Sequence, residues 1–548
     1  SDTEVLLHVI ESVGLERALT KLNGMFAFAV YDLSLKVLSL CRDPIGEKPL
    51  YYGTIGDRFY FSSELSSIES VCAGNLSICR EAVYQQSMVS YIPAPGSIYK
   101  GIYKLESGSY VTYSGGVVAS SKRFWTLQET IDSGRKNLIN DMNEGVDELE
   151  RAIERSVVLR MSSDVPVGAF LSGGTDSSLI SALMAKNSTQ PINTFTIGFE
   201  NTAYDESISA KVIANYLGAN HTEAIFSETD ILEWVPKMGH VYSEPFSDSS
   251  QLPMCLVSVL AGEKVKVVLS GDGGDELFLG YLRYQATKAI WKKIKNVPAR
   301  GIVAKLLRVT PTRILDLFFF YLGSHASKYG RTSSVGNKLK TLSRWIDSTS
   351  IEDFYVASMM HFGIHESVVI GVDKPLAVSF FDIKSTMLDD FDEWMMSVDT
   401  LNYLPDDILT KIDRATMSVG LEGRVPLLDP AVVAMAWRIP LSYKTYEGVP
   451  KWPLKQILNK HVPRNLTDRP KTGFGVPINL WLRNELKEWA QDLLSFNRLK
   501  DQQLYNPYLI DGLLTRHLEG KENNGAKLWN VLMFQSWLDS NPKRKLTL

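Results

Sequence analysis

Short apolar and alternating runs dominate the first 120 residues of the chain. They predict strands at residues 23–32, 37–43, 49–53 and 58–63, continuing as one antiparallel meander, with hairpin material at 96–113. Residues 4–13 are amphipathic and predict a helix ahead of these strands. Sheet and helix in this proportion predict an α+β domain over residues 1–120.

The pattern changes after a polar stretch at residues 121–142, which we interpret as an irregular linker. Apolar residues recur at helical spacing in 143–161. Apolar runs at 165–171, 192–197, 221–226 and 265–269 then alternate with helical segments at 179–185, 206–217 and 231–238. Strands alternating with helices predict a parallel sheet, so residues 143–548 are expected to form an α/β domain with helical additions towards the C-terminus.

A loop of small residues joins the strand at 165–171 to the helix after it. At a helix N-terminus, free N–H groups and the helix dipole attract an anion, and glycines let phosphate approach the backbone. A carboxylate beside phosphates suits Mg²⁺. The loop has no Lys after its second glycine, so it is not a Walker A loop. It resembles the pyrophosphate-binding loop of ATP pyrophosphatases, although an ordinary turn with a helix cap is the alternative; its polar and glycine residues are Ser172, Gly173, Gly174, Asp176, Ser177 and Ser178.

A second acidic, glycine-rich loop, residues 270–276, follows the strand at 265–269. Ligands of parallel sheets bind beyond the carboxyl ends of the strands, so Asp176 and Asp275 are expected to face one Mg²⁺ and a triphosphate. Downstream, Lys471 lies in a loop rich in Pro and Gly and could neutralise charge on the α-phosphate and the departing pyrophosphate. Helix capping by Asp275 and a surface turn around Lys471 are the competing interpretations.

Length, net charge and cysteine content limit the classes of protein to which the chain can belong. The 548 residues exceed the ~250–300 residues at which single cores stop growing, so more than one domain is expected. The net charge of −4 creates no field that would recruit nucleic acid or an anionic membrane. The four cysteines form no CxxC pair, which fits a reducing cytoplasm. The most apolar run, residues 314–322, is too short to span a bilayer and predicts a buried helix.

Taken together, the motifs resemble the glutamine-dependent asparagine synthetase family. The similarity spans nearly the whole chain, with little of it at 281–395, and is carried by residues 22–29, 42–52, 244–250, 403–407, 413–417, 421–429 and 526–530. The resemblance implies an incomplete class II glutamine amidotransferase domain with an Ntn-type sandwich. It implies a second domain of the ATP-pyrophosphatase, or adenine nucleotide alpha-hydrolase-like, fold.

In this family a substrate carboxylate attacks the α-phosphate of ATP, and ammonia then attacks the acyl carbon. The resemblance implies β-aspartyl-AMP as the intermediate, asparagine, AMP and pyrophosphate as products, and Mg²⁺ held by Asp176 and Asp275. Lys471 would stabilise the transition state of adenylation. Asp272 falls where many members have a Glu proposed to deprotonate ammonia, and its shorter side chain leaves a helix-capping role as the alternative. The AMP pocket would be lined by Leu171, Ile197, Ser270 and Gly271.

The chain departs from the family at its first residue. The family's glutaminase uses an N-terminal Cys as nucleophile, whereas this chain begins with Ser1. Asp2 matches the family residue that binds the α-amino group of glutamine. We therefore expect the chain as written not to hydrolyse glutamine, and we expect it to be a fragment of a longer protein.

Three functions remain open at this stage. The first is an asparagine-forming ligase in the cytoplasm, acting on small molecules, with homodimerisation as a further expectation. The second is an amide ligase with another acceptor, such as the sugar acid of a surface polysaccharide, for which Glu244 and Asp248 are candidate pocket residues. The third is a nucleotide-binding relative without catalysis.

Overall fold

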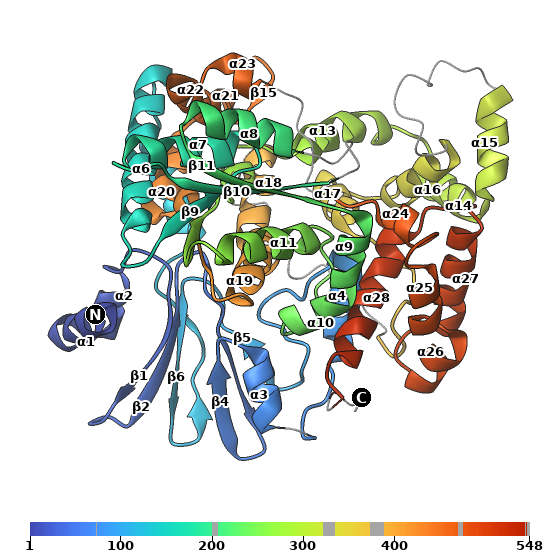
Figure 1. The fold of residues 1–548 in the computed structure, drawn as a ribbon. Helices are drawn as coiled ribbons and strands as arrows, with labels where there is room; N and C mark the ends of the chain where they lie inside the picture. The colour runs from blue at the N-terminus through green and yellow to red at the C-terminus, as the bar shows by residue number, and fades with distance from the viewer. Residues whose placement is uncertain are drawn as a thin grey trace.

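The computed structural model describes residues 1–72, 74–199, 206–321, 335–372, 388, 390–468, 475–542 and 544. Figure 1 shows the strands of the N-terminal part, in blue, below a larger α/β part, with the red C-terminal helices at the right. The predicted helix at 4–13 is confirmed as α1 (Asp2–Val13).

The N-terminal part contains two antiparallel sheets. In one sheet, β2 (Val37–Arg42) pairs with β1 (Ala27–Asp32) and with β6 (Ser109–Ser114), which also pairs with β7 (Val117–Val118) and β8 (Lys122–Arg123). In the other, β3 (Tyr51–Ile55) pairs with β4 (Arg58–Ser62) and β5 (Ile102–Lys104). The prediction of one continuous meander, with hairpin material at 96–113, is therefore wrong: β5 and β6 belong to different sheets.

A buried carboxylate explains where the chain leaves the first sheet. Asp43, directly after β2, accepts hydrogen bonds from the backbone N–H groups of Gly46 (2.6 Å), Glu47 (2.9 Å) and Lys48 (2.9 Å). These bonds fix a tight turn that carries the chain towards β3. Alternating hydrophobicity predicts strands, but it does not show which strands become neighbours.

The segment at 121–142 differs from the irregular linker that its polar composition predicts. It contains β8 and the helix α5 (Leu127–Lys136), which begins after the N-cap Thr126. Leu127 and Ile131 are buried. Gly134 lies against α20 (Pro430–Arg438), where a Cβ atom would come within 2.7 Å of the Trp437 carbonyl group. An amphipathic helix this short is easily concealed by polar neighbours.

The predicted parallel sheet is confirmed, with five strands in the order β11-β10-β9-β12-β13. Four were expected: β9 (Val167–Phe170), β10 (Asn193–Phe199), β11 (Asn220–Phe226) and β12 (Val267–Leu269). The edge strand β13 (Glu422–Arg424) was not predicted, because three residues are too few to show a hydrophobic periodicity. The chain moves outwards from β9 in one direction and then adds β12 on the other side, so the topological switch point lies between β9 and β12.

Helices cover both faces of this sheet. Figure 1 shows α7 (Thr175–Lys186) and α8 (Ser207–Tyr216) on one side, and α11 (Gln251–Gly262) and α19 (Leu409–Met417) on the other. The expected helix at 143–161 is α6 (Met142–Met161), whose Val146, Leu149, Ile153 and Val157 are buried as their spacing predicts.

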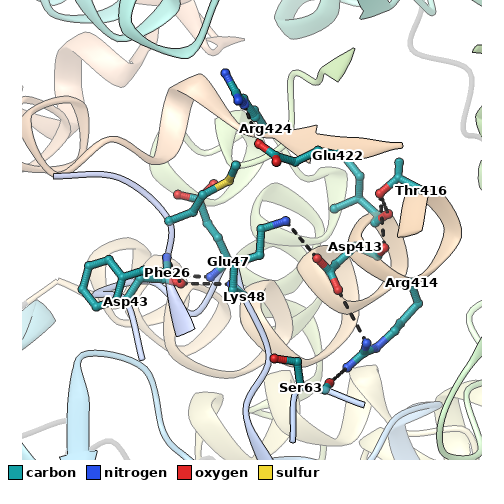
Figure 2. A network of polar contacts seen from close by, with 12 residues as sticks. Phe26, Asp43, Glu47, Lys48, Ser63, Asp413, Arg414, Thr416, Glu422 and Arg424 are labelled. Atoms are coloured by element: carbon teal, nitrogen blue, oxygen red, sulfur yellow. Dashed lines mark hydrogen bonds and ion pairs between the residues drawn. The ribbon is translucent and has the colours of Figure 1, made fainter. Parts of the chain in front are cut away.

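Buried ion pairs join the N-terminal sheets to the α/β part. Lys48 lies 3.0 Å from Asp413, and Arg414 donates to the Ser63 carbonyl oxygen, as Figure 2 shows. Arg160 makes a bidentate pair with Glu47, at 2.6 and 2.7 Å.

The apolar run at 314–322 lies largely in α15 (Thr312–Tyr321). Its prediction as a buried helix is wrong in part, because Ile314 and Leu317 are more than half exposed. Within the described part of the chain, no helix combines the length and apolar character needed to cross a membrane.

Candidate functional site

The first predicted loop lies at the carboxyl end of β9 and leads into α7. Gly173 has φ of +77°, a conformation that glycine adopts without strain, and a Cβ atom there would lie 2.9 Å from the Ser209 side chain. The α7 N-cap is Gly174, and no side chain caps it. The first N–H groups of α7 are thus left for an anion.

Serine side chains fix the shape of this loop. The hydroxyl groups of Ser172 and Ser177 lie 3.0 Å apart, and the backbone N–H of Gly174 donates to Ser172 Oγ. Ser178 is fully buried beneath them. Of the predicted phosphate contacts, Ser172 and Ser177 are therefore placed at the loop surface, whereas Ser178 faces the interior.

The second loop, after β12, lies directly against the first. A Cβ atom on Gly271 would come within 2.6 Å of the Ser177 backbone nitrogen, and one on Gly274 would lie 2.5 Å from Asp176 Oδ1. Glycine is thus required at both positions for this approach. The structure brings together the two acidic loops that sequence reasoning placed at one sheet edge.

A lysine that the sequence did not single out lies between the two carboxylates. Lys451 Nζ is 2.7 Å from Asp275 Oδ1 and forms a second ion pair with Asp176. The Lys451 side chain is 8% exposed. Burial alone would lower the pKa of Lys451, but the carboxylates of Asp176 and Asp275 raise it, so the ammonium group stays charged.

No sequence pattern singles out Lys451, but its backbone conformation marks it in the structure. It has φ of +55° and stands immediately before α22 (Trp452–His461), where a cation opposes the helix dipole. A strained, unfavourably placed cation is a signal of function. The segment before Lys451 is a hairpin in which β14 (Thr445–Tyr446) pairs antiparallel with β15 (Val449–Pro450).

The donor set fits Mg²⁺ and a triphosphate. Two carboxylates from adjacent strand ends are hard oxygen ligands. The glycines that face them leave a space that any Cβ atom would fill, as Gly274 shows for Asp176. Asp176 and Asp275 would hold the metal, with the N-terminus of α7 beside them for phosphate oxygens.

Asp272 occupies the same loop. Its Oδ2 accepts a 2.6 Å hydrogen bond from the Ser270 hydroxyl group. Burial raises the pKa of this carboxyl group, whereas Ser270 and the cations of Lys411 and Lys451 partly oppose the shift. Neither Asp272 nor Asp275 is the N-cap of α12 (Gly274–Leu277), because that position is Gly273. The structure therefore contradicts the interpretation that Asp272 or Asp275 caps this helix.

The other residues that the sequence predicts for the site lie in varied surroundings. Leu171 and Ile197 are buried in the apolar core, with Leu171 packed on α8. Asp2 is exposed in the first turn of α1 and accepts from the backbone N–H of Thr3. Lys471 lies outside the described residues. Glu244 is buried and pairs with Lys104 of the N-terminal part, whereas Asp248 lines a cavity of about 400 Å³ and accepts a 2.6 Å hydrogen bond from Lys411.

Comparison with known proteins places this chain in a family. Residues 148–539 match the asparagine synthase model, and residues 1–125 match a glutamine amidotransferase domain. The chain belongs to the asparagine synthase family. The two matched regions correspond to the α/β part and to the two N-terminal sheets, so this family member carries both modules.

Named relatives of this asparagine synthase family member cover most of its length. Glutamine-hydrolysing asparagine synthetase 1 of Bacillus subtilis (strain 168) is 33% identical over 554 aligned residues, covering 100% of this chain and 82% of the relative. A putative glutamine-hydrolysing asparagine synthetase of Mycobacterium bovis is 30% identical over 98% of this chain and 79% of its own. A putative one from Methanocaldococcus jannaschii is 38% identical over 52% of this chain and 54% of its own.

Proposed function

We propose that this protein is an ATP-dependent amide ligase that activates a carboxylate as an acyl-adenylate and transfers ammonia to it. The convergence of Asp176, Asp275 and Lys451 at the switch point of the sheet carries this proposal. A site built from one cation, two carboxylates and a helix N-terminus suits a nucleotide polyphosphate. The resemblance to asparagine synthetases supports aspartate as acceptor and asparagine as product.

The first step forms a bond between the acceptor oxygen and the α-phosphorus and breaks the bond to the β-phosphate, releasing pyrophosphate. Mg²⁺, when bound, would neutralise charge on the phosphates of the substrate. Lys451 is placed to stabilise the negative charge that grows on the α-phosphate and pyrophosphate oxygens. The loop N–H groups at the start of α7 orient the pyrophosphate end.

The second step joins nitrogen to the acyl carbon and breaks the carbon–oxygen bond to AMP. The attacking ammonia must lose a proton, and Asp272 is the carboxylate of the loop assigned to take it. A raised pKa suits a general base better than the ordinary value of aspartate, because it brings the group closer to the working pH. The glutamine amidotransferase module supports glutamine as the source of ammonia in the complete protein.

Acceptor-dependent exchange of labelled pyrophosphate into ATP tests the first step. Asp176→Asn is expected to lower the exchange rate more than 100-fold, because one of the two carboxylates assigned to the metal is lost. Asp132→Asn, a matched change of an exposed residue on α5, is expected to leave exchange unchanged. Full exchange in Asp176→Asn, or acceptor-independent release of ADP by the unchanged protein, would contradict the proposed ligase.

A further inference from the structure

Two consecutive helices at the edge of the α/β part carry exposed apolar side chains. α14 (Arg300–Val309) and α15 both pack against α16 (Val335–Trp345), and Figure 1 shows the three helices at the right-hand edge of the molecule. On α14 and α15, five apolar side chains that the structure describes are more than half exposed: Ile302, Leu306, Val309, Ile314 and Leu317. These five are the outer apolar residues.

Helical spacing explains why the outer apolar residues share one face of each helix. Ile302, Leu306 and Val309 occupy positions i, i+4 and i+7 of α14, and Ile314 and Leu317 are three residues apart on α15. A surface helix normally turns such a stripe towards the protein core. Both helices here leave it outside, so it is available to an apolar partner.

Charged side chains of the two helices point inwards instead. Arg308 on α14 donates to Asp347 (2.8 Å) and to the carbonyl oxygen of Ser343 (2.8 Å) on α16. Asp316 on α15 accepts a 2.6 Å hydrogen bond from the backbone N–H of Gly336 on α16. Rotating either helix to bury its apolar stripe would break these bonds, so the packing on α16 keeps the outer apolar residues exposed.

The chain around these helices is strongly basic. Between Glu276 and Asp316 it contains nine basic residues and no acidic one, so the overall charge of −4 conceals a local excess of positive charge. Lys288 on α13 (Leu282–Ile294) pairs with Asp392. Four other lysines are exposed and form no ion pair among the described residues: Lys292, Lys293, Lys295 and Lys305.

Aliphatic side chains next to lysines suit the surface of an anionic membrane. Helices that lie along a membrane insert an apolar face, while their lysines keep the charged end at the level of the headgroups. Protein–protein interfaces are instead poor in lysine and rich in aromatic residues, and platforms for single-stranded nucleic acid use exposed aromatic rings. The outer apolar residues are all aliphatic.

We propose that α14 and α15 dock this protein on an anionic membrane surface. The outer apolar residues enter the boundary between headgroups and acyl chains, and the four exposed lysines face the lipid phosphates. The attachment is peripheral, because the helices lie along the interface and not across it. It goes beyond the proposed ligase function and does not depend on it.

Flotation of the full chain with lipid vesicles tests this proposal. Vesicles that mix phosphatidylcholine with phosphatidylglycerol supply the anionic surface, and phosphatidylcholine alone is the neutral comparison. We expect binding to the mixed vesicles to be at least 10-fold tighter, because each lysine near the surface is attracted by the anionic lipid. Raising the salt from about 0.1 M to about 1 M should weaken it, since the charges are then screened.

Leu306→Glu is expected to weaken vesicle binding at least 10-fold, because a carboxylate replaces an aliphatic side chain that enters the membrane. Val5→Glu is the matched control. Val5 is 62% exposed on α1, and Leu306 is 58% exposed on α14. Figure 1 shows α1 at the opposite side of the molecule, so this change should leave binding unaltered.

The charge contribution is tested separately. Lys292→Gln combined with Lys293→Gln is expected to weaken binding to the mixed vesicles about 10-fold. Lys21→Gln combined with Lys36→Gln removes the same charge from exposed lysines of the N-terminal part and should have no effect.

Three outcomes would overturn the proposal. The first is no binding to either kind of vesicle, and the second is equal binding by Leu306→Glu and Val5→Glu. The third concerns a second copy of the chain as the partner: sedimentation velocity without lipid would show a dimer that Leu306→Glu converts into monomers. Pyrophosphate exchange by Leu306→Glu should equal that of the unchanged protein, which separates docking from the ligase function.

Discussion

At the scale of single residues, the ion pairs of Lys451 join the two acidic loops to each other. The lysine contributes one positive charge against the two negative charges of Asp176 and Asp275. Net negative charge remains at the site, which favours a divalent cation, and the cation in turn favours the polyphosphate. The same lysine can move towards phosphate oxygens when these compete for it, because its stem is flexible.

A second buried lysine, Lys444, forms no ion pair with a carboxylate among the described residues. Lys444 is 1% exposed, and its Nζ lies 4.7 Å from the ring centroid of Trp437 and 3.9 Å from the sulfur of Met396. Burial lowers the pKa of Lys444 to about 7. The unfolded chain keeps the ordinary value near ~10.4, so it binds more protons between these two values, and stability rises with pH across that window.

Lys444→Met is expected to increase the free energy of unfolding at pH 6 by about 2–4 kcal/mol, because below pH 7 the folded protein otherwise holds a charged ammonium group in a buried place. The gain should shrink as the pH rises towards 10. Urea unfolding followed by tryptophan fluorescence at pH 6 and pH 9 measures both effects. If the variant and the unchanged protein differ equally at the two pH values, Lys444 does not titrate in this window.

At the scale of elements, short turns rather than long helices bring the charged groups together. The turn at Gly280, between α12 and α13, passes so close to the site that a Cβ atom would lie 1.9 Å from Lys451 Cε and 2.1 Å from Asp275 Oδ1. The π-helix η5 (Asp399–Ile408) includes Pro405 and carries Asp399, which accepts a hydrogen bond from Arg283. Such helices often occur at functional sites.

Gly280→Ala is expected to lower pyrophosphate exchange at least 10-fold, because the added methyl group displaces Lys451 from Asp275. The fold should survive, since the lysine stem can move aside. Gly301→Ala on α14 (Arg300–Val309) is the control, because its added Cβ meets no atom within 4 Å apart from its own stretch of helix backbone and its chain neighbours. Equal exchange in the two variants would argue against a role for the Lys451 position, and circular dichroism would verify that both are folded.

Elements near the nucleotide loop could be predicted because local sequence determines them. The strand β9, the loop at Ser172–Ser178 and the helix α7 follow each other along the chain, so hydrophobic pattern and glycine placement suffice. Lys451 and β13 reach the site from more than 145 residues beyond β12, and only tertiary packing reveals them. A cavity lined by Arg283, Tyr403 and Trp529 was missed for the same reason, because its walls come from elements spread along most of the chain.

At the scale of the whole molecule, the two modules are joined by charges as well as by apolar contacts. Arg160 on α6 and Glu47 between β2 and β3 are both buried, and the pair is bidentate. Lys48 and Asp413 form a further ion pair between the two modules, as Figure 2 shows. A buried charge left without its partner is strongly destabilising, so these ion pairs stabilise one arrangement of the modules.

Glu47→Gln is expected to lower the free energy of unfolding by about 3–5 kcal/mol, because Arg160 keeps its charge in a buried place. The double variant Glu47→Leu with Arg160→Met removes both charges and should recover most of that loss. Chemical unfolding of the three proteins gives the comparison. A double variant as unstable as Glu47→Gln would indicate that packing, not charge, holds this interface.

The separation of the site along the chain has a consequence for biosynthesis. A ribosome delivers Asp176 first, Asp275 about a hundred residues later and Lys451 long after both. Until that lysine emerges, the nascent polypeptide holds two neighbouring acids without their counter-charge, so it cannot complete the nucleotide site. Nucleotide chemistry by this protein is thereby deferred until the segment that carries Lys451 has been made.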